Sequence, residues 1–357
     1  MAKKYGFQHI GFADHVAAPF HHLAIRRKEL VGHDPDQVSL GQASRRNFPF
    51  LAVDQPAGVA VCGHDRARIA FQHFQARLLA QVGEVQDIAD FVGDSLELSI
   101  KASQTDADVI VFCGVHFMAE TASILSPAKT VLLPRRDAGC PMADMVTPEA
   151  LKKKLAALPP MPVVTYVNST AEVKALSTIC CTSANAFEVV ESLDGDEVLM
   201  VPDRNLALNT AARSRKKIHT WEGYCPFHNL LTVEEVDAAK ARHPEAVFMA
   251  HPECPPEVVA LADVAVSTSG MIRYAQKSAA TDFIVGTEVG MRYPLEKACP
   301  GKTFHMVSPR MHCDDMKKIS LADIVRCLET MAGEVKVPEE IRVPALKAVQ
   351  RMVDLSI

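Results

Sequence analysis

Three of the ten cysteines recur at an almost constant interval, and each follows a stretch typical of a buried strand. They are Cys140, Cys225 and Cys313, separated by 85 and 88 residues. Such spacing predicts three repeated α/β units that each contribute one cysteine to a shared centre. Three thiolates suit an iron–sulfur cluster. A cluster with three cysteine ligands leaves one iron open, and an open iron can act as a Lewis acid on a hydroxyl or carboxylate.

Zinc is an alternative metal for part of this set. Cys225-Pro-Phe-His228 and His251-Pro-Glu-Cys254 together offer two sulfurs and two nitrogens, a combination that zinc accepts. The Cys-x-x-His spacing is not the usual zinc-finger one. Cysteines in apolar surroundings are expected to be inert core residues. These are Cys113, Cys180, Cys181 and Cys327.

Hydroxyl, amide and acid–base side chains follow several of the predicted strands. Active sites in parallel α/β sheets gather at the carboxyl ends of strands. Serine or threonine at a helix N-terminus can bind a carboxylate or phosphate, although each one alone is more often a plain N-cap. Such residues recur at successive strand ends, and one of these ends also carries a His/Glu pair that could transfer protons. Together they predict a small anionic substrate beside a metal centre. The residues are Ser95, Tyr166, Asn168, Ser183, His251, Glu253, Ser267 and Thr268.

The elements that position these residues alternate along the chain from residue 81 onward. Apolar runs closed by turn residues predict strands, and amphipathic segments with Thr or Pro at their start predict helices. This alternation predicts an α/β fold with mostly parallel sheets. The predicted strands are 108–114, 130–133, 163–167, 198–201, 217–220, 247–250, 283–285 and 303–307, and the better-defined helices are 117–125, 233–242, 257–262 and 345–355.

Composition restricts the class of protein further. Apolar residues make up 48% and charged residues 23% of the 357, which supports a buried core and excludes wholesale disorder. A net charge of −5 argues against a nucleic-acid partner. No apolar run approaches the roughly 18 residues of a membrane span, and no secretory signal is visible. We therefore expect a cytoplasmic protein with no membrane partner and no disulfide framework.

The motifs together resemble the quinolinate synthase family. Gly139-Cys-Pro-Met-Ala143, Gly223-Tyr-Cys-Pro-Phe-His228 and Cys313-Asp-Asp-Met-Lys317 carry the cysteines of the resemblance. The match extends from Gln81 to the C-terminus, about three quarters of the chain. Further matching segments are 86–98, 114–120, 166–170, 181–185, 202–206, 251–255 and 286–291.

The resemblance implies a particular architecture. Three similar Rossmann-like α/β/α units would surround a pseudo-threefold axis, with a cluster at the centre. Residues 81–145 would complete the first unit, 146–230 would form the second and 231–315 the third. Residues 316–357 would be C-terminal helices packing back on the first unit, and residues 1–80 remain an unmatched N-terminal segment.

The resemblance also implies an activity. The family condenses iminoaspartate with dihydroxyacetone phosphate to quinolinate in de novo NAD biosynthesis, releasing phosphate and water, and L-aspartate oxidase would supply the iminoaspartate. By resemblance a [4Fe–4S] cluster would be held by Cys140, Cys225 and Cys313, and Glu253 is favoured for proton transfer. Matching acid–base positions are His228, His251 and Glu253. Matching substrate-binding positions are Ser95, Tyr166, Asn168, Ser183, Ser267 and Thr268.

The N-terminal segment departs from the family. Residues 1–80 hold seven of the fourteen histidines and a single glutamate, Glu29. The family's His-x-Tyr motif falls on Leu78-Leu79-Ala80, whose side chains neither donate nor accept protons. A frame error near residue 80 is the favoured explanation, and a divergent extension is the alternative.

This departure bears on activity. We expect the first sheet to lack its first strand and the activity to be impaired. A non-catalytic iron–sulfur protein of the same fold is the alternative function. A zinc hydrolase would use the Cys/His ligands instead, and a dehydrogenase is disfavoured because no Gly-x-Gly-x-x-Gly follows a strand.

Overall fold

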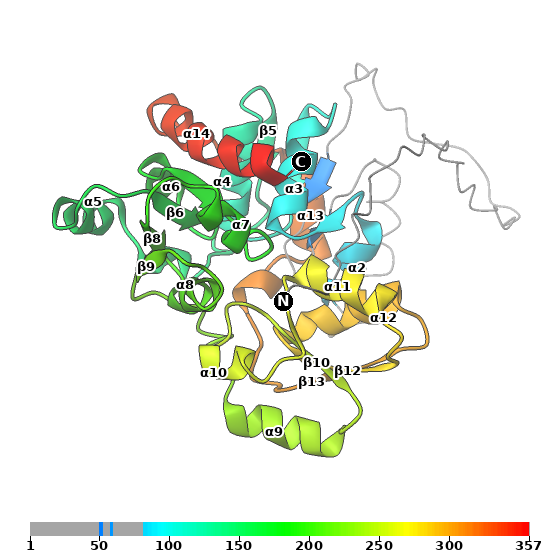
Figure 1. Cartoon of the computed structure of the whole chain (residues 1–357). Helices are drawn as coiled ribbons and strands as arrows, with labels where there is room; N and C mark the ends of the chain where they lie inside the picture. The colour runs from blue at the N-terminus through cyan, green and yellow to red at the C-terminus, as the bar shows by residue number, and fades with distance from the viewer. Residues whose placement is uncertain (1–49, 53–57, 60–80, 357) are drawn as a thin grey trace, which may run out of the picture. The chain divides into compact units, whose positions relative to one another are not determined.

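The computed structural model describes residues 50–52, 58–59 and 81–356. In this part of the chain, three all-parallel sheets and one antiparallel pair of short strands alternate with helices, which confirms the predicted α/β class (Figure 1). Among the helices described, none combines the length and apolar character that crossing a membrane requires.

Each parallel sheet is built from consecutive segments of the chain. The first has the order β1-β4-β5, the second β7-β6-β8-β9 and the third β11-β10-β12-β13, while β2 pairs with β3. The first sheet and the antiparallel pair contain β1 (Phe50–Ala52), β4 (Val109–Phe112), β5 (Thr130–Leu132), β2 (Gly58–Val59) and β3 (Val92–Gly93). The second sheet contains β6 (Val163–Tyr166), β7 (Ile179–Cys181), β8 (Glu197–Val201) and β9 (Lys217–Thr220). The third contains β10 (Val247–Ala250), β11 (Val264–Ala265), β12 (Asp282–Gly286) and β13 (Thr303–Met306).

The helices begin where the sequence provides caps. Thr147 accepts the backbone N–H of Ala150 ahead of Pro148, and Thr232 forms a reciprocal capping box with Glu235. The α-helices are α2 (Gln81–Ile88), α3 (Ser95–Gln104), α4 (His116–Leu125), α5 (Pro148–Ala156), α6 (Ala171–Ala175), α7 (Ala186–Glu191), α8 (Arg204–Ala211), α9 (Val233–Arg242), α10 (Pro256–Val259), α11 (Thr268–Lys277), α12 (Arg292–Ala298), α13 (Leu321–Thr330) and α14 (Glu339–Ser356). Short 3₁₀ turns are η2 (Ala143–Met145), η3 (Val289–Met291) and η4 (Asp315–Lys317).

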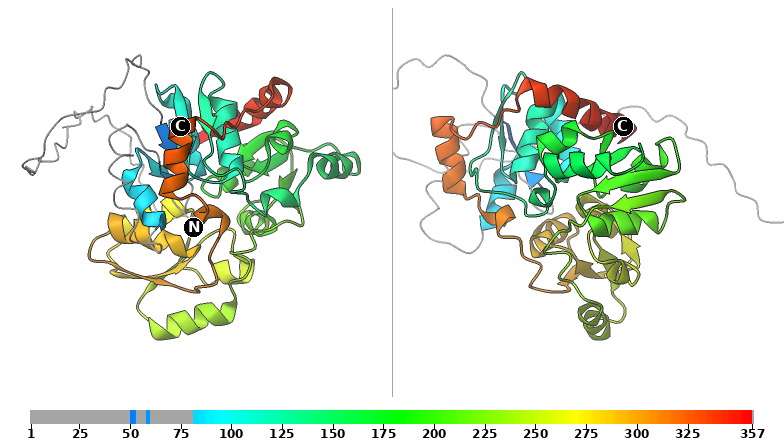
Figure 2. Two further views of the ribbon diagram at one scale, coloured as in Figure 1. Left: turned by 180° about the vertical axis from the view of Figure 1, so that it is seen from behind. Right: turned by 90° about the vertical axis from the view of Figure 1, so that its left-hand side faces the viewer.

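The third sheet is covered by helices on both faces. Figures 1 and 2 show α9 on one side of β10, β12 and β13, and α11 with α12 on the other. Phe248 and Ile284 pack in one apolar cluster with α9, whereas Met249 and Phe283 pack in a second cluster with α11 and α12. Alternate residues of one strand thus fill two cores, as expected for a parallel sheet buried on both faces.

The C-terminal helix joins the first two sheets. Helix α14 packs against α6 and β7 and also against α4, with Val349 and Met352 fully buried. The predicted helix over 345–355 is confirmed, but it begins earlier, at Glu339. Pro344 lies inside the helix, and the first turn is closed by the N–H groups of Ile341 and Arg342, which donate to the Pro338 carbonyl.

The expectation that the first sheet lacks its first strand is wrong for the described residues. Strand β1, from the segment without family resemblance, runs parallel to β4, with Leu51 opposite Val111. Leu78, Leu79 and Ala80 lie outside the described residues. The proposed unit boundaries at 145, 230 and 315 stay a prediction.

Candidate active site

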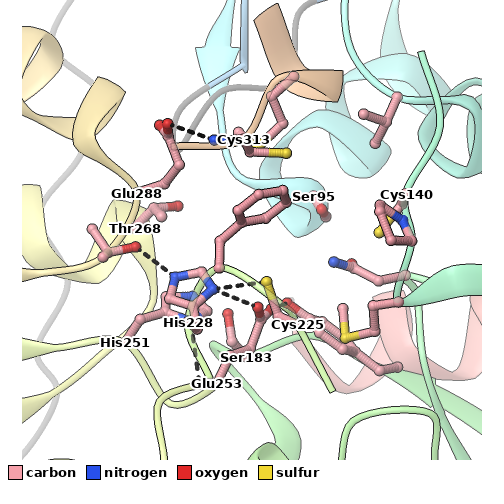
Figure 3. A pocket seen from close by; sticks show the side chains of 18 of the residues that line it. Ser95, Cys140, Ser183, Cys225, His228, His251, Glu253, Thr268, Glu288 and Cys313 are labelled. Carbon is pink, nitrogen blue, oxygen red and sulfur yellow. Dashed lines mark hydrogen bonds and ion pairs between the residues drawn. The ribbon is translucent and has the colours of Figure 1, made fainter. Parts of the chain in front are cut away.

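A single cavity collects the carboxyl ends of strands from all three parallel sheets. It contains about 850 Å³ of space not filled by protein atoms, part of it open to solvent. Residues that follow β4, β5, β6, β7, β9, β10, β11, β12 and β13 line it, as do those at the start of α3. Figure 3 shows many of the lining side chains. Eleven of the twelve predicted site residues line this cavity: Ser95, Cys140, Tyr166, Asn168, Ser183, Cys225, His228, His251, Glu253, Thr268 and Cys313.

The three cysteines at the predicted interval are presented by similar turns. In each turn the backbone N–H three residues further on acts to lower the pKa of the cysteine thiol. A nearby backbone N–H favours a thiolate, and N–H groups around the sulfurs are a feature of iron–sulfur sites. The pairs are Cys140 with Ala143, Cys225 with His228, and Cys313 with Met316.

These thiols are suited to a positively charged group. Burial raises the pKa of Cys140 and Cys225 well above the usual value and that of Cys313 to about 11. Without a metal they are therefore protonated at neutral pH, and a bound metal would deprotonate them. Three soft donors facing one cavity from different sides fit a three-cysteine cluster (Figure 3).

Two buried carboxylates hold the loops that carry these cysteines. Asp203 Oδ2 accepts the backbone N–H of Cys225 at 3.2 Å, and Glu288 Oε1 accepts that of Cys313, also at 3.2 Å. Lys317 forms an ion pair with Glu288, and Gly290 N donates to its other oxygen at 2.7 Å. Sequence analysis did not single out either acid, because an Asp or Glu after a strand is usually a solvated residue.

Glu253 is the centre of a buried polar network. Its Oε1 accepts the Tyr166 hydroxyl at 2.5 Å, and its Oε2 lies 2.9 Å from His228 Nδ1. Burial opposes ionisation of Glu253, but His228, His251 and the Tyr166 hydrogen bond outweigh it and lower the pKa to about 2. The carboxylate is therefore charged and stabilised at neutral pH.

The two histidines lie against each other. The His228 and His251 rings stack with centroids 4.6 Å apart. The backbone N–H of Glu253 donates to His251 Nδ1 at 3.3 Å, which assigns the ring proton of neutral His251 to Nε2. Burial lowers the pKa of His251 to about 3, so the ring is neutral under ordinary conditions.

Two helix N-termini face the cavity from different parts of the chain. Ser95 begins α3 and Thr268 begins α11, and both line the cavity. The helices are linked because Asp94, the N-cap of α3, accepts the hydroxyl of Ser267 at 3.3 Å and its backbone N–H donates to Ser269 at 3.2 Å. Ser267 does not line the cavity; its hydroxyl caps α11 by accepting the N–H of Gly270. Paired helix N-termini favour an anionic ligand.

One polar atom of the cavity wall has no partner in the described residues. The side-chain oxygen of Asn168 is buried and accepts no hydrogen bond there. A buried acceptor in this state is costly, and a ligand that donates a hydrogen bond would satisfy it. Sequence analysis did not single out several further lining residues: Val115, Phe117, Met142, Phe227, Thr287, Glu288 and Met316.

The alternative zinc set predicted from the sequence is not brought together in the structure. Cys254 is fully buried in an apolar cluster, and its thiol donates to the Gly286 carbonyl at 3.4 Å. It does not line the cavity, whereas Glu253 does. The donors near Cys225 are instead His228 and Glu253.

The fold and the site define an α/β enzyme whose active-site cavity is lined by cysteines and placed between parallel sheets. The model of the quinolinate synthetase A protein family matches residues 74–354, and the chain belongs to this family. The match begins seven residues before the expected Gln81.

Named relatives agree with this assignment. The chain is 60% identical to a quinolinate synthase of Geobacter metallireducens over 270 residues, which cover 76% of this chain and 89% of the relative. It is 54% identical to quinolinate synthase 1 of Methanosarcina acetivorans over 292 residues, covering 82% and 94% of the two chains.

Proposed function

We propose that this chain condenses iminoaspartate with dihydroxyacetone phosphate to quinolinate, in the cytoplasm, as a step of NAD biosynthesis. L-aspartate oxidase would supply the iminoaspartate. The observation that carries the proposal is the arrangement of one cavity: three cysteines in matching turns lie near the Glu253 network and two helix N-termini. Family membership supports the reaction class.

A [4Fe–4S] cluster bound by Cys140, Cys225 and Cys313 would supply a Lewis-acidic iron when present. The residues fit this group because a backbone N–H favours the thiolate form of each cysteine and two ligand loops are fixed by Asp203 and Glu288. The protein's part is to hold the thiolates at three points of the cavity wall and to keep the substrate oriented.

Different lining residues would bind different parts of the substrate. The N-termini of α3 and α11, with Ser95 and Thr268, suit a phosphate or carboxylate. The unpartnered oxygen of Asn168 suits an N–H or O–H donor of the substrate. Ser183 acts to lower the pKa of Tyr166 and also lines the cavity.

Proton transfer is proposed for Glu253, supported by His228 and His251. A carboxylate whose pKa is about 2 is a weak base. A substrate that takes the Tyr166 hydroxyl as its own partner would remove one of the bonds that keep this pKa low, and Glu253 would become more basic. Neutral His251 would donate its Nε2–H to a substrate oxygen.

The missing His-x-Tyr motif is proposed to lower the rate. The test is quinolinate formation by the full chain after anaerobic cluster reconstitution, compared with a Leu78→His, Ala80→Tyr double variant and a Glu253→Gln variant. We expect cluster uptake in all three, faster turnover in the double variant and none in Glu253→Gln. Failure to take up iron, or turnover unaffected by Glu253→Gln, would contradict the proposal. If the unmodified chain and the double variant both take up the cluster but form no quinolinate, the result favours the alternative, a non-catalytic iron–sulfur protein.

A further inference from the structure

Three different metal-ligand atoms converge on one point beside the cavity. His228 Nδ1 lies 3.1 Å from Cys225 Sγ and 2.9 Å from Glu253 Oε2. The three donor atoms all lie within 4.8 Å of one another. Because a carboxylate oxygen can only accept, we assign the ring proton to Nδ1, between the sulfur and the carboxylate oxygen, where a metal ion could replace it.

The distances are close to those of a tetrahedral zinc site. Zinc bonds of about 2.3 Å to sulfur and about 2.0 Å to nitrogen and oxygen place such donors roughly 3.3–3.6 Å apart. The observed separations of 3.1 and 2.9 Å need to open by only a few tenths of an ångström. Side-chain rotation of Cys225 and Glu253 can supply this.

Charge balance also favours a divalent cation. His228 and Glu253 are 8% and 3% exposed, so a net charge left here would be poorly solvated. One thiolate and one carboxylate neutralise Zn²⁺. The site is therefore neutral when filled, which a buried position requires.

Two of the three ligands, Glu253 and His228, are held in place by contacts of their other polar atom. Glu253 Oε1 accepts the Tyr166 hydroxyl, which leaves Oε2 available. His228 Nε2 lies 2.9 Å from the Thr287 hydroxyl, which can donate or accept. Thr287 thus accommodates the histidine proton on Nε2 when Nδ1 binds a metal, the arrangement usual for metal-bound histidines.

We propose that Cys225, His228 and Glu253 form a mononuclear zinc site, with water from the cavity as fourth ligand. On binding, the Cys225 thiol loses its proton to solvent and the His228 proton moves from Nδ1 to Nε2, so one proton is released in total. Because Cys225 is also assigned to the cluster, zinc and cluster exclude one another. Zinc binding itself does not depend on the proposed reaction.

Cobalt titration of the full, cluster-free chain under anaerobic conditions tests this site. Co²⁺ is expected to bind at one equivalent with a thiolate-to-cobalt absorption band in the near ultraviolet, and Zn²⁺ should displace it. His228→Ala and Glu253→Ala are expected to weaken binding by at least the roughly 10–100-fold that loss of a supporting residue costs a metal site. Circular dichroism checks that each variant is folded.

Matched cysteine variants separate this site from the other thiols. Cys140→Ala, Cys313→Ala and Cys254→Ala are expected to keep the band. A band lost in Cys140→Ala or Cys313→Ala would mean that the metal binds the three cluster cysteines, and a band kept in His228→Ala would exclude this ligand set. Either result, or no band in the unmodified chain, overturns the proposal.

Competition with the cluster gives a second readout. Chain preloaded with one equivalent of zinc is expected to take up little iron and sulfide, and a chelator should restore uptake. Equal uptake with and without zinc would contradict the shared use of Cys225. The cobalt result stands apart from the quinolinate assay, so failure of the proposed reaction would not be mistaken for failure of the zinc site.

Discussion

Neutralising Glu288 should destabilise the fold and loosen the Cys313 loop. Glu288 is 4% and Lys317 is 16% exposed at the side chain, and the two form an ion pair. In Glu288→Gln the Lys317 charge loses its partner. The single amide oxygen also cannot serve both the Cys313 and Gly290 N–H groups that Glu288 now accepts. Breaking one partner of a buried pair costs about 3–5 kcal/mol, so we expect a loss of this size in the free energy of unfolding.

Urea unfolding of the cluster-free chain measures this loss of stability in Glu288→Gln, in Lys317→Met and in the double variant that carries both changes. Because the double variant has no unpaired charge, it should cost less than the sum of the two single variants by about 1 kcal/mol or more. Lys318→Met is the matched control: Lys318 is a third exposed and pairs with Asp315, so its loss should cost no more than about 1 kcal/mol. Single-variant losses that add to within about 0.5 kcal/mol would refute the coupling. In reconstituted protein, faster iron loss from Glu288→Gln than from Lys318→Met would report the altered Cys313 loop.

Two further predictions concern the helix N-termini. Burial and the Glu97 charge raise the pKa of Asp94, so its ionised form is disfavoured in the fold and its stabilising contribution falls as pH rises through the folded-state pKa. Asp94→Asn keeps the cap without the charge, so its stability relative to the unmodified chain should rise from pH 4 to pH 7. Asp94→Ala removes the cap and should cost about 1–2 kcal/mol. Urea unfolding across this pH range checks both variants, and a stability difference between Asp94→Asn and the unmodified chain that does not change with pH would contradict the argument. Ser267→Ala removes a cap and should lower the free energy of unfolding by about 1 kcal/mol. Thr268→Ala should mainly raise the KM for the proposed phosphate-bearing substrate. A destabilised Thr268→Ala together with a raised KM in Ser267→Ala would reverse the two roles.

Local sequence patterns predicted most of the strands because buried parallel strands are continuous apolar runs. The segments 217–220 and 247–250 match their observed bounds, and capping residues located the helix over 233–242. The short strand β11 has too few residues to show a pattern. The pairing of β1 with β4 depends on a distant partner and was expected to be missing.

The same distinction between local and distant signals applies to the residues of the candidate site. The cysteine interval and the polar strand ends could be found in the sequence, because each of these residues lies directly after its own strand. The burial of Asp203 and Glu288 could not, because it depends on Cys225, Cys313 and Lys317, which lie 22 to 29 positions along the chain. Ser267 and Thr268 are adjacent, and only the start of α11 decides which of them faces the cavity.

The distribution of the three thiols over the chain also bears on folding. Any group that binds Cys140, Cys225 and Cys313 together closes two loops of 85 and 88 residues. In the chain-entropy treatment of cross-links, closing a loop of that length disfavours the unfolded ensemble by about 4–5 kcal/mol. The cofactor would thus act as a three-way cross-link as well as a chemical centre. During synthesis this cross-link cannot be completed until Cys313 has left the ribosome, so the third ligand becomes available only when most of the chain has been made.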